Sequence, residues 1–367
     1  MREGWEYKKF ENCIVKSPKL KQVKKEAYNN GSQYPIISQE EKFISGYCDD
    51  ESIVCHIDRP IVVFGDHTRV LKYIDFDFVV GADGVKVIIP IKSIDSKFLL
   101  YFLQWYNIPN LGYSRHYKLL KDVMVPIPNC TTQQTIISEL DKLNKLIHIK
   151  KEQLKDYDAL AQSIFYEMFG DPVENEKGWE VKKFGEIGTL ERGAGISKKD
   201  FVDDGLPCIH YGQLHTTFGA YTRKNITFIP KDLLPKYKIA HSGDLILAIT
   251  SEDVEGSCKS TAWLGDYDVV VGSDAAIFHH NQNGIYLSYY TRTKAFYNEK
   301  AKYAKGFKVT HISTKEIASI SICVPPLSIQ NIFANKIEQI EKQKAIIQNI
   351  IMDLETLLAS RMQYWFD

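Results

Sequence analysis

The chain of 367 residues contains an internal repeat, and this repeat limits its possible folds more than any other feature. Residues 4–10 (GWEYKKF) return 174 positions later as residues 178–184 (GWEVKKF), with six of seven positions identical. Four further matches follow in the same order: residues 34–37 with 206–209, 79–83 with 270–274, 110–113 with 304–307, and 125–128 with 322–325. The offset widens to 197 by the last match, mostly through insertions in the second copy. Chance explains such an ordered series poorly, so we expect one folding unit written twice.

Each copy begins with short apolar runs that are separated by turn residues. Runs typical of strands are residues 61–64 and 85–89 in the first copy, and 245–249 and 268–271 in the second. Gly, Asp and Asn punctuate these runs, as turns require. Residues 96–106 have the pattern of a helix. Each copy is therefore predicted to form a compact mixed sheet with a few helices, which leaves through a proline-containing segment.

A long helix follows each mixed segment. The apolar positions that repeat at steps of three and four are Ile136, Leu140, Leu143, Ile147, Leu154, Tyr157 and Ile164 in the first helix, and Phe333, Ile337, Ile340, Ile347, Ile351, Leu354 and Leu358 in the second. A period of about 3.5 residues over about five heptads is typical of a coiled-coil seam. The alternative is that each helix only covers its own domain, but such a helix usually stops after about 20 residues. At about 1.5 Å per residue, helices of about 36 residues would be roughly 54 Å long, and the natural partner of each is the other.

The expected fold class is α+β, with two pseudo-repeated mixed α/β domains separated by an antiparallel coiled coil of two long helices. The predicted parts are a first domain at 1–130 (head 1), a central helix at 131–170, a linker at 171–177, a second domain at 178–324 (head 2) and a C-terminal helix at 325–367.

Net charge argues against a chain whose whole surface grips nucleic acid, because 46 basic residues balance 46 acidic ones. The charges are distributed unevenly, however. Each head holds 18 basic and 16 acidic residues, whereas each long helix and the linker are acidic. The neutral total thus conceals two mildly basic heads.

Basic residues also cluster locally with aromatic ones. Head 2 holds Arg292, Lys294, Lys300, Lys302, Lys305 and Lys308 among Phe and Tyr residues, followed by Thr310 and His311. The matching stretch of head 1 holds Tyr113, Arg115, His116 and Lys118, and residues 16–25 hold five lysines and no acid. Such mixtures suit contacts with phosphates and base edges. The alternative is a basic face that is merely solvated.

The sequence shows no motif typical of catalysis, metal binding or membrane insertion. The sequence has no phosphate-binding glycine loop, nucleophile elbow or HExxH. Asp75 with Asp77, and Asp266 with Asp268, are better explained as turn residues before strands, and the histidines 241, 279 and 280 show no partner. Cys48, Cys55 and His56 lack a second pair at zinc spacing. Seven scattered cysteines and no apolar run of eighteen predict a cytoplasmic protein with reduced thiols.

At this point the chain resembles the specificity subunit of type I restriction-modification enzymes. The resemblance rests on the GWE-type openings, the VPIP and VPP exits into long helices, the stretches FGDHTR (64–69) and VGADG (80–84), and PPLSIQ (325–330) before the second helix. It covers nearly the whole chain, and it adds His67 and Arg69 to the candidate DNA-binding residues. Head 1 departs from the pattern by being about twenty residues shorter than head 2, which puts one or two of its recognition loops in doubt.

The resemblance implies that each head reads one half of a split site in double-stranded DNA and that the helices fix the spacing. It further implies two methyltransferase subunits, which bring S-adenosylmethionine and flip the target adenine. A restriction subunit with ATP and Mg²⁺ often joins them. This chain would hold no cofactor, no metal and no catalytic residue of its own. Two other hypotheses stay open: a two-headed adaptor that holds protein partners at a fixed separation, and a metal-dependent nuclease.

Overall fold

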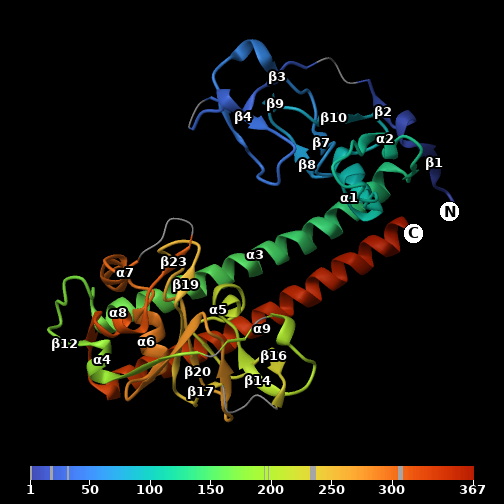
Figure 1. Cartoon of the computed structure of the whole chain (residues 1–367). Helices are drawn as coiled ribbons and strands as arrows, with labels where there is room; N and C mark the ends of the chain where they lie inside the picture. The colour runs from blue at the N-terminus through green and yellow to red at the C-terminus, as the bar shows by residue number, and fades with distance from the viewer. Residues whose placement is uncertain are drawn as a thin grey trace. The chain divides into compact units, whose positions relative to one another are not determined.

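The structure, a computed structural model, describes residues 2–16, 20–30, 33–193, 195–196, 198–231, 237–304 and 309–367 (Figure 1). Its internal contacts divide the chain into two compact units. Unit 1 comprises Met1–Glu152 with Gln348–Asp367, and unit 2 comprises Gln153–Ile347. Each unit thus contains one head and a part of both long helices, so the helices are not structures apart from the heads.

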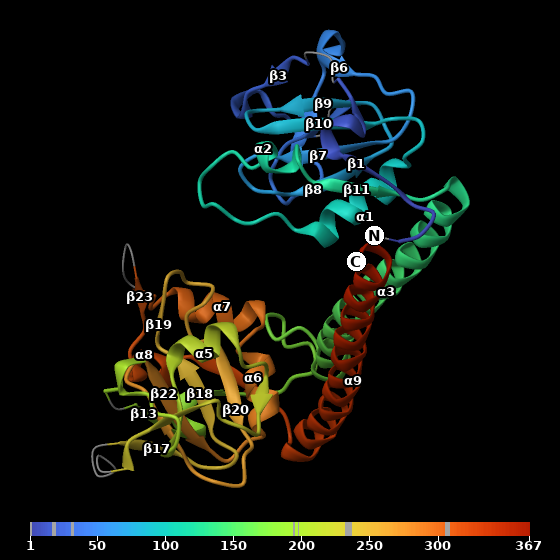
Figure 2. The ribbon, with the colours of Figure 1, turned by 90° about the vertical axis from the view of Figure 1, so that its right-hand side faces the viewer.

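Head 1 contains two small sheets. The first has the strand order β2 (Ile14–Val15), β10 (Val85–Pro90), β7 (Ile61–Gly65) and β8 (Leu71–Ile74); the second has β3 (Gln22–Val23), β9 (Phe78–Gly81), β4 (Tyr34–Ile37) and β5 (Gly46–Cys48), with β6 (Val54–Cys55) also on β9. The strands β1 (Glu6–Lys9) and β11 (Met124–Ile127) pair separately, and the helices are α1 (Ser96–Tyr106) and α2 (Tyr117–Leu120). Figure 2 shows α1 beside the first sheet.

The central strand β7 of head 1 is buried on both faces. Val62 and Phe64 face the core that includes α1, while Ile61 and Val63 face the core between the two sheets. A strand covered on both sides needs a continuous apolar run rather than strict alternation. That requirement explains why residues 61–64 were readable as a strand.

Head 2 repeats this plan with longer connections. Its first sheet has the order β13 (Gly188–Arg192), β22 (Ala275–His280), β18 (Leu245–Ala248), β20 (Ser260–Trp263) and β15 (Tyr221–Thr222). Its second has β16 (Thr227–Ile229), β14 (Leu206–Ile209), β21 (Val269–Val271) and β17 (Lys238–Ala240). The pairs β12 (Glu180–Lys183) with β24 (Ser321–Val324) and β19 (Thr250–Ser251) with β23 (Thr310–His311) complete the strands. The helices are α4 (Phe184–Ile187), α5 (Tyr211–Thr216), α6 (Gly284–Tyr290), α7 (Lys294–Ala301) and α8 (Thr314–Ala318).

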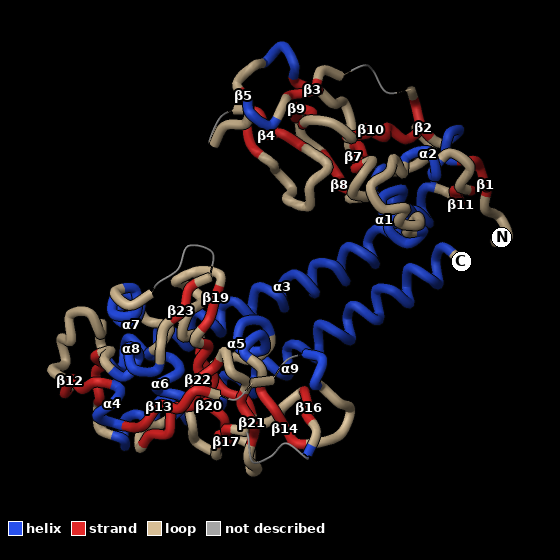
Figure 3. Tube along the Cα trace, in the orientation of Figure 1, coloured by secondary structure: helices blue, strands red, loops and turns tan. Residues whose placement is uncertain are grey.

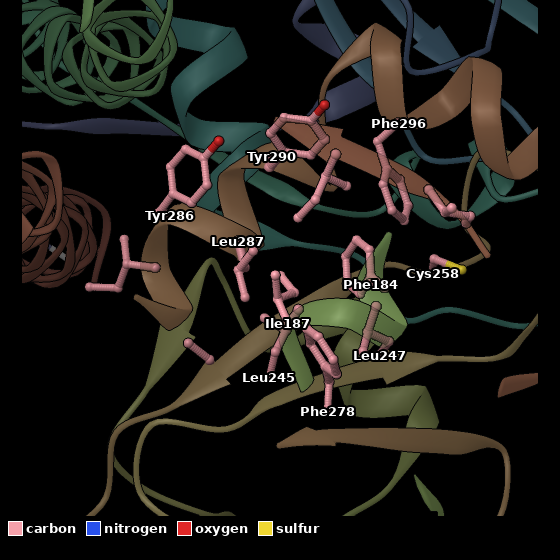
Figure 4. Packing of buried hydrophobic residues seen from close by; sticks show 14 of the residues in the cluster. Phe184, Ile187, Leu245, Leu247, Cys258, Phe278, Tyr286, Leu287, Tyr290 and Phe296 are labelled. Carbon is pink, nitrogen blue, oxygen red and sulfur yellow. The ribbon is translucent and has the colours of Figure 1, made fainter. Parts of the chain in front are cut away.

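Most strands of head 1 have an equivalent in head 2, which confirms the predicted repeat, although among the described residues β3 has no counterpart in head 2 and β15, β19 and β23 have none in head 1. In each head one parallel pair, β4 with β9 and β14 with β21, is flanked by antiparallel neighbours in the same order. The core of head 2 packs Phe184 and Phe296 against Phe278 and Leu247 of the first sheet (Figure 4). Four of the five aligned sequence segments fall on equivalent strands: β1 and β12, β4 and β14, β9 and β21, and β11 and β24.

The long helices are α3 (Cys130–Phe169) and α9 (Leu327–Phe366), drawn in blue in Figure 3. They run antiparallel: in unit 1 Lys151 bonds Glu355 at 2.7 Å, and in unit 2 Asp158 bonds Lys344 at 2.7 Å. Of the predicted seam, Ile136, Leu140, Leu143, Ile147, Phe333, Ile337, Ile340, Ile347 and Ile351 are buried, and Leu154, Tyr157, Ile164, Leu354 and Leu358 are half-buried. The coiled coil is therefore as predicted.

The apolar positions of the long helices serve both purposes considered above: they cover the helix's own head and they form the coiled-coil seam. Ile136 and Leu140 belong to the core of head 1, and Phe333 and Ile337 belong to the core of head 2. The beginning of each helix therefore covers its own head, and only then does the same apolar stripe meet the other helix.

Two matched glutamines hold the beginnings of the helices. The Gln133 amide donates to the Ser93 and Pro128 carbonyls at 2.8 and 2.9 Å, and its oxygen accepts from the Asp95 N–H at 2.8 Å. Gln330 donates to the Pro325 carbonyl at 2.8 Å and accepts from the Asn283 N–H at 2.9 Å. Because both side chains are buried, these bonds fix each helix to its head.

The ends of the helices are also matched. Phe169, which closes α3, contacts Tyr286 of α6 with ring centroids 4.8 Å apart. Phe366, which closes α9, contacts Phe98 of α1 at 5.6 Å. The Trp179 indole donates to the Phe169 carbonyl at 2.8 Å, so the GWE motif of head 2 caps a helix.

Within the described residues, none of the helices combines the length and apolar composition that crossing a bilayer demands. All seven cysteines are free thiols, of which Cys130 is exposed and the others are buried.

Candidate nucleic-acid interface

Equivalent backbone hydrogen bonds within each head identify the same edge of the fold in head 1 and in head 2. The Asp66 N–H donates to the Gly84 carbonyl at 2.6 Å and the His116 N–H to the Asp66 carbonyl at 2.8 Å. In head 2, Ile249 and Ile312 make the corresponding bonds, to Asp274 and Ile249, at 3.0 and 3.1 Å. We call this the loop edge: residues 66–70 and 107–118 in head 1, and residues 249–259, 302–304 and 309–313 in head 2. It holds most of the predicted DNA-binding residues.

Three predicted residues of head 1 lie on the surface of its loop edge. Tyr113 is 95% exposed, and Arg115 and Lys118 are exposed as well. The Tyr113 ring stacks on the His67 ring, with centroids 5.1 Å apart and planes at 13°. Gly112, with φ of +70°, makes the turn that presents Tyr113.

His116 lies inside the domain, which corrects the expectation that it faces DNA. Its side chain is fully buried. Nε2 accepts from the Leu111 N–H at 3.0 Å, so Nδ1 carries the proton and donates to the Asp66 carbonyl at 2.9 Å. With both ring nitrogens used, His116 holds the base of the loop that carries Tyr113.

Arg69 is likewise engaged by the protein. Its guanidinium donates to the Ile108 carbonyl at 2.9 Å and to the Asn107 side chain at 3.4 Å, at the C-terminal end of α1. A cation is favourable there because the helix dipole is negative at that end. The structure therefore gives the half-buried Arg69 a role in joining α1 to the loop edge.

Sequence reasoning missed Lys72, which organises the same edge. The buried Lys72 ammonium donates to the carbonyls of Ser38, Lys42 and Phe43 at 3.0, 2.6 and 3.2 Å. Burial lowers the pKa of Lys72. The sequence feature that could have indicated this role is a lone lysine within an apolar strand. A buried ammonium is tolerated there only if it is hydrogen-bonded.

The loop held by Lys72 is in turn bonded to the loop edge. The Gln39 side chain accepts from the His67 N–H at 3.1 Å, and the Gln39 carbonyl accepts from the Thr68 hydroxyl at 2.6 Å. The backbone of His67 is thereby positioned from the second sheet.

The loop edge of head 2 carries the short pair β19 and β23 (Figure 3). His311 is exposed, and its Nδ1 lies 3.3 Å from the Thr250 hydroxyl. Thr310 is only 5% exposed, so the prediction that it contacts DNA is corrected: its side chain points into the head.

The basic cluster predicted in head 2 does not form one patch. Lys294 and Lys302 are exposed, although Lys302 pairs with Glu299. The buried Lys300 donates to the Glu255 and Ser257 carbonyls at 2.8 and 2.6 Å, and burial lowers its pKa. Lys305 and Lys308 lie outside the described residues.

Arg292 also bonds the backbone of head 2. Its Nη2 donates to the Ser260 and Gly219 carbonyls at 2.8 and 3.2 Å, and its Nη1 bonds Ser288. Arg292 is nevertheless exposed, so its contact with DNA stays a prediction.

A cavity of about 970 Å³, which we call the basin, opens beside the loop edge of head 2. It is lined mainly by residues of α5, the 250–259 connection and α7. The lining residues Lys198, His215 and Lys259 were not among the candidates from the sequence. Lys259 donates to the His215 carbonyl at 2.8 Å. Of these residues, only Lys198, which is followed by a second lysine, could have been recognised from the sequence as a candidate phosphate contact.

Histidine–aspartate pairs occur in both heads. In head 1 His56 lies 2.7 Å from Asp77; in head 2 His241 lies 2.8 Å from Asp268 and His279 lies 2.8 Å from Asp244. His241 and His279 therefore have partners, contrary to expectation. No group of three His, Cys, Asp or Glu side chains suited to a metal ion occurs in the part of the chain that the structure describes.

Comparisons with known proteins address the family of this chain. The family model described as "Type I restriction modification DNA specificity domain" matches twice, over residues 2–156 and 176–356. Each match contains one head and most of the helix that follows it.

Curated relatives carry the same description. The chain is 24% identical over 268 residues to the type I restriction enzyme MjaVIII specificity subunit of Methanocaldococcus jannaschii, covering 64% of this chain and 62% of the relative. It is 23% identical to the EcoR124I/EcoR124II specificity subunit of Escherichia coli, covering 84% and 79%. The match to the E. coli EcoKI specificity subunit covers only 39% of that relative. The chain thus spans less than two thirds of some of these relatives.

Two solved structures share the fold. The S subunit of a type I restriction-modification system from M. genitalium aligns with a TM-score of 0.58 at 12% identity, over 99% of this chain and 96% of that one. A chain from a study of assembly and conformational transition of the type I R-M system aligns at 0.56 and 15% identity, over 100% and 98%.

Proposed function

The chain belongs to the type I restriction modification DNA specificity domain family, and from this premise we propose that it is the DNA sequence-specificity subunit of a type I restriction-modification system. Each head reads one half of a bipartite site in double-stranded DNA. The antiparallel helices α3 and α9 set the spacing between the halves.

One observation carries this proposal: two heads with the same strand order present different loop edges. Five residues, 66–70, join β7 to β8, whereas residues 249–259 join β18 to β20 and include β19. A shared frame with different surface loops suits a protein that reads two different sequences, because sequence is read by side chains at the surface and not by the core.

The proposed DNA contacts of head 1 fall into two chemical classes. Arg115 and Lys118 are exposed cations suited to phosphates, whereas Tyr113 and His67 are suited to a base. In head 2, Lys294, Lys302 and His311 are the exposed counterparts, and Lys305 and Lys308 remain predictions from the sequence alone. Lys198, which lines the basin, is a further proposed phosphate contact.

The helices are the proposed docking surface for two methyltransferase subunits. In unit 1, Leu146, Ile149, Met352 and Leu357 are between 45 and 57% exposed although their helices bury other apolar positions. A cavity of about 660 Å³ runs along this part of the helix pair, lined by Ser138, Lys142, Leu143, Leu357 and others. Exposed apolar side chains beside such a groove suit a protein partner.

Chemistry belongs to the partners in this proposal. A methyltransferase subunit holds S-adenosylmethionine and receives the flipped adenine. A restriction subunit holds ATP and Mg²⁺ where cleavage accompanies methylation. This chain contributes recognition and geometry.

Sequencing of methylated bases tests the proposal. Cells that express the chain with its own methyltransferase should carry adenine methylation at a bipartite motif. Replacing residues 178–324 by the second head of a related subunit should change one half of the motif and leave the other half intact. A change in both halves would contradict a separate reader in each head, and the absence of any motif would favour the two-headed adaptor.

A further inference from the structure

Four buried side-chain polar atoms have no hydrogen-bond partner among the described residues. They are His67 Nδ1, Ser114 Oγ, Thr261 Oγ1 and His280 Nε2. Buried polar atoms are nearly always paired, so each unpaired one needs an explanation. Two of the four, in His67 and Ser114, lie together at the loop edge of head 1.

Tyr113 connects these two residues. Its ring is stacked on His67, and Ser114 is the next residue along the chain. Tyr113 is itself 95% exposed, so few contacts other than the stack hold its ring in place. The backbones on either side are fixed, because Gln39 binds the His67 N–H and His116 binds the base of the 107–116 loop. A loosely held ring therefore lies against the imidazole of His67, whose backbone is fixed.

We propose that His67 and Ser114 form a polar contact site for one nucleobase of the DNA, and that Tyr113 moves off this site when DNA binds. The inference rests on the proposed function. It adds a specificity-determining pair to head 1 and a rearrangement that accompanies reading.

The chemistry of the two atoms suits a base edge. A serine hydroxyl donates and accepts, and an imidazole Nδ1 does either according to its tautomer, so together they can match a donor and an acceptor on one base. Neither group needs a charge to do so. The site therefore differs from a phosphate contact, which depends on a cation and on salt.

The described residues at the matching place in head 2 are arranged differently. There β19 pairs with β23, and the Thr250 hydroxyl lies 3.3 Å from His311 Nδ1, so these polar groups satisfy each other. Among the described residues of the two loop edges, the unpaired buried atoms thus belong to head 1.

The test uses the full chain, its methyltransferase and duplexes that carry the methylated motif. His67→Phe keeps a ring for Tyr113 to stack on but removes Nδ1, and Ser114→Ala removes the hydroxyl. Each should reduce discrimination against one substituted base pair in the head 1 half-site by roughly 5- to 100-fold, the range expected for a lost base contact. The slope of affinity against salt should stay unchanged, because no charge is lost.

Folding is checked with the same variants. Removing an unpaired buried polar atom should leave the melting temperature unchanged or raise it, so a loss of discrimination cannot be ascribed to unfolding. The matched control is Thr261→Val, which removes an unpaired buried hydroxyl from β20 of head 2. It should alter neither half of the motif.

Movement of Tyr113 has its own readout. With 3-fluorotyrosine at position 113, the fluorine resonance should shift when a duplex with the motif is added, because the ring leaves His67. An unchanged resonance would overturn the rearrangement. If the wild-type chain yields a bipartite motif while both substitutions preserve discrimination, only this inference fails; if the wild-type chain yields no motif, the proposed function itself fails.

Discussion

Head 1 and head 2 share the central strands of both sheets in the same order, yet their loop edges differ in kind. In head 1 the connection has five residues, the Tyr113 ring stacks on His67, and a smaller cavity of about 220 Å³ is lined in part by Arg69, Asn107 and Ile108. In head 2 the longer 249–259 connection and α7 surround a basin of about 970 Å³. The insertions lie outside the frame, and the registers of the paired strands are unaffected by them. Recognition surfaces can therefore diverge without a cost in core packing.

The largest expected effect tests whether the hydrophobic cores of the two heads contribute equally to stability. Phe169 closes α3 against head 2, and Phe366 closes α9 against head 1. Phe169→Ala and Phe366→Ala should each lower the free energy of unfolding by about 3–5 kcal/mol, because each empties a buried aromatic site. Urea denaturation measures the loss, and hydrogen exchange assigns it to a unit.

Leu146→Ala, at a side chain that is 45% exposed, is the control and should cost far less. A large loss for one phenylalanine and a small loss for the other would show that the frames share topology but not stability.

An effect of pH on stability, of intermediate size, should distinguish head 2 from head 1. Burial lowers the pKa of His280, at the end of β22, to about 4. Between about pH 6.5 and pH 4 the unfolded chain binds a proton there and the folded chain does not, so the stability of unit 2 should fall as pH drops through this window, by about 3 kcal/mol in all. At the matching end of β10 stands Pro90, which does not titrate.

Hydrogen exchange measured at pH 7 and pH 4.5 provides the comparison. His280→Asn keeps an acceptor for the Gln282 N–H, which His280 Nδ1 binds at 3.2 Å, and should remove most of this pH dependence. An equal pH dependence in wild type and variant would assign the effect to other groups.

The smallest effect concerns the exposed cations at the loop edge of head 1 and at the two ends of α7 in head 2. Arg115→Ala and Lys118→Ala in head 1, and Lys294→Ala and Lys302→Ala in head 2, should each reduce the slope of log affinity against log salt by about one unit for a lost phosphate contact. Stability should change by less than about 0.5 kcal/mol. Fluorescence anisotropy with a labelled duplex over a range of salt gives the slope.

Lys300→Met is the contrasting control, because its ammonium bonds only the protein's own carbonyls. It should lower stability and leave the slope unchanged. Were Lys300→Met to change the slope as much as Lys294→Ala, the distinction between structural and DNA-facing lysines in head 2 would be lost.

Much of the frame was predictable from the sequence. Repeated segments such as 79–83 and 270–274 mark equivalent strands, and the heptad positions from Ile136 to Leu358 mark the coiled coil. The candidate site was predictable only as a region. Tyr113 and Arg115 lie on the surface as expected, whereas His116 and Thr310, each next to an exposed neighbour, point inward.

The sequence by itself determined the repeat, the strands and the two long helices, because periodicity along the chain reports which side of an element is buried. Tertiary structure decided the roles of the polar residues. Lys72, Lys300 and Arg69 are cations like those on the surface, and their hydrogen bonds to particular backbone carbonyls make them structural. A loop side chain has no periodic constraint, so its direction depends on what the rest of the fold places beside it.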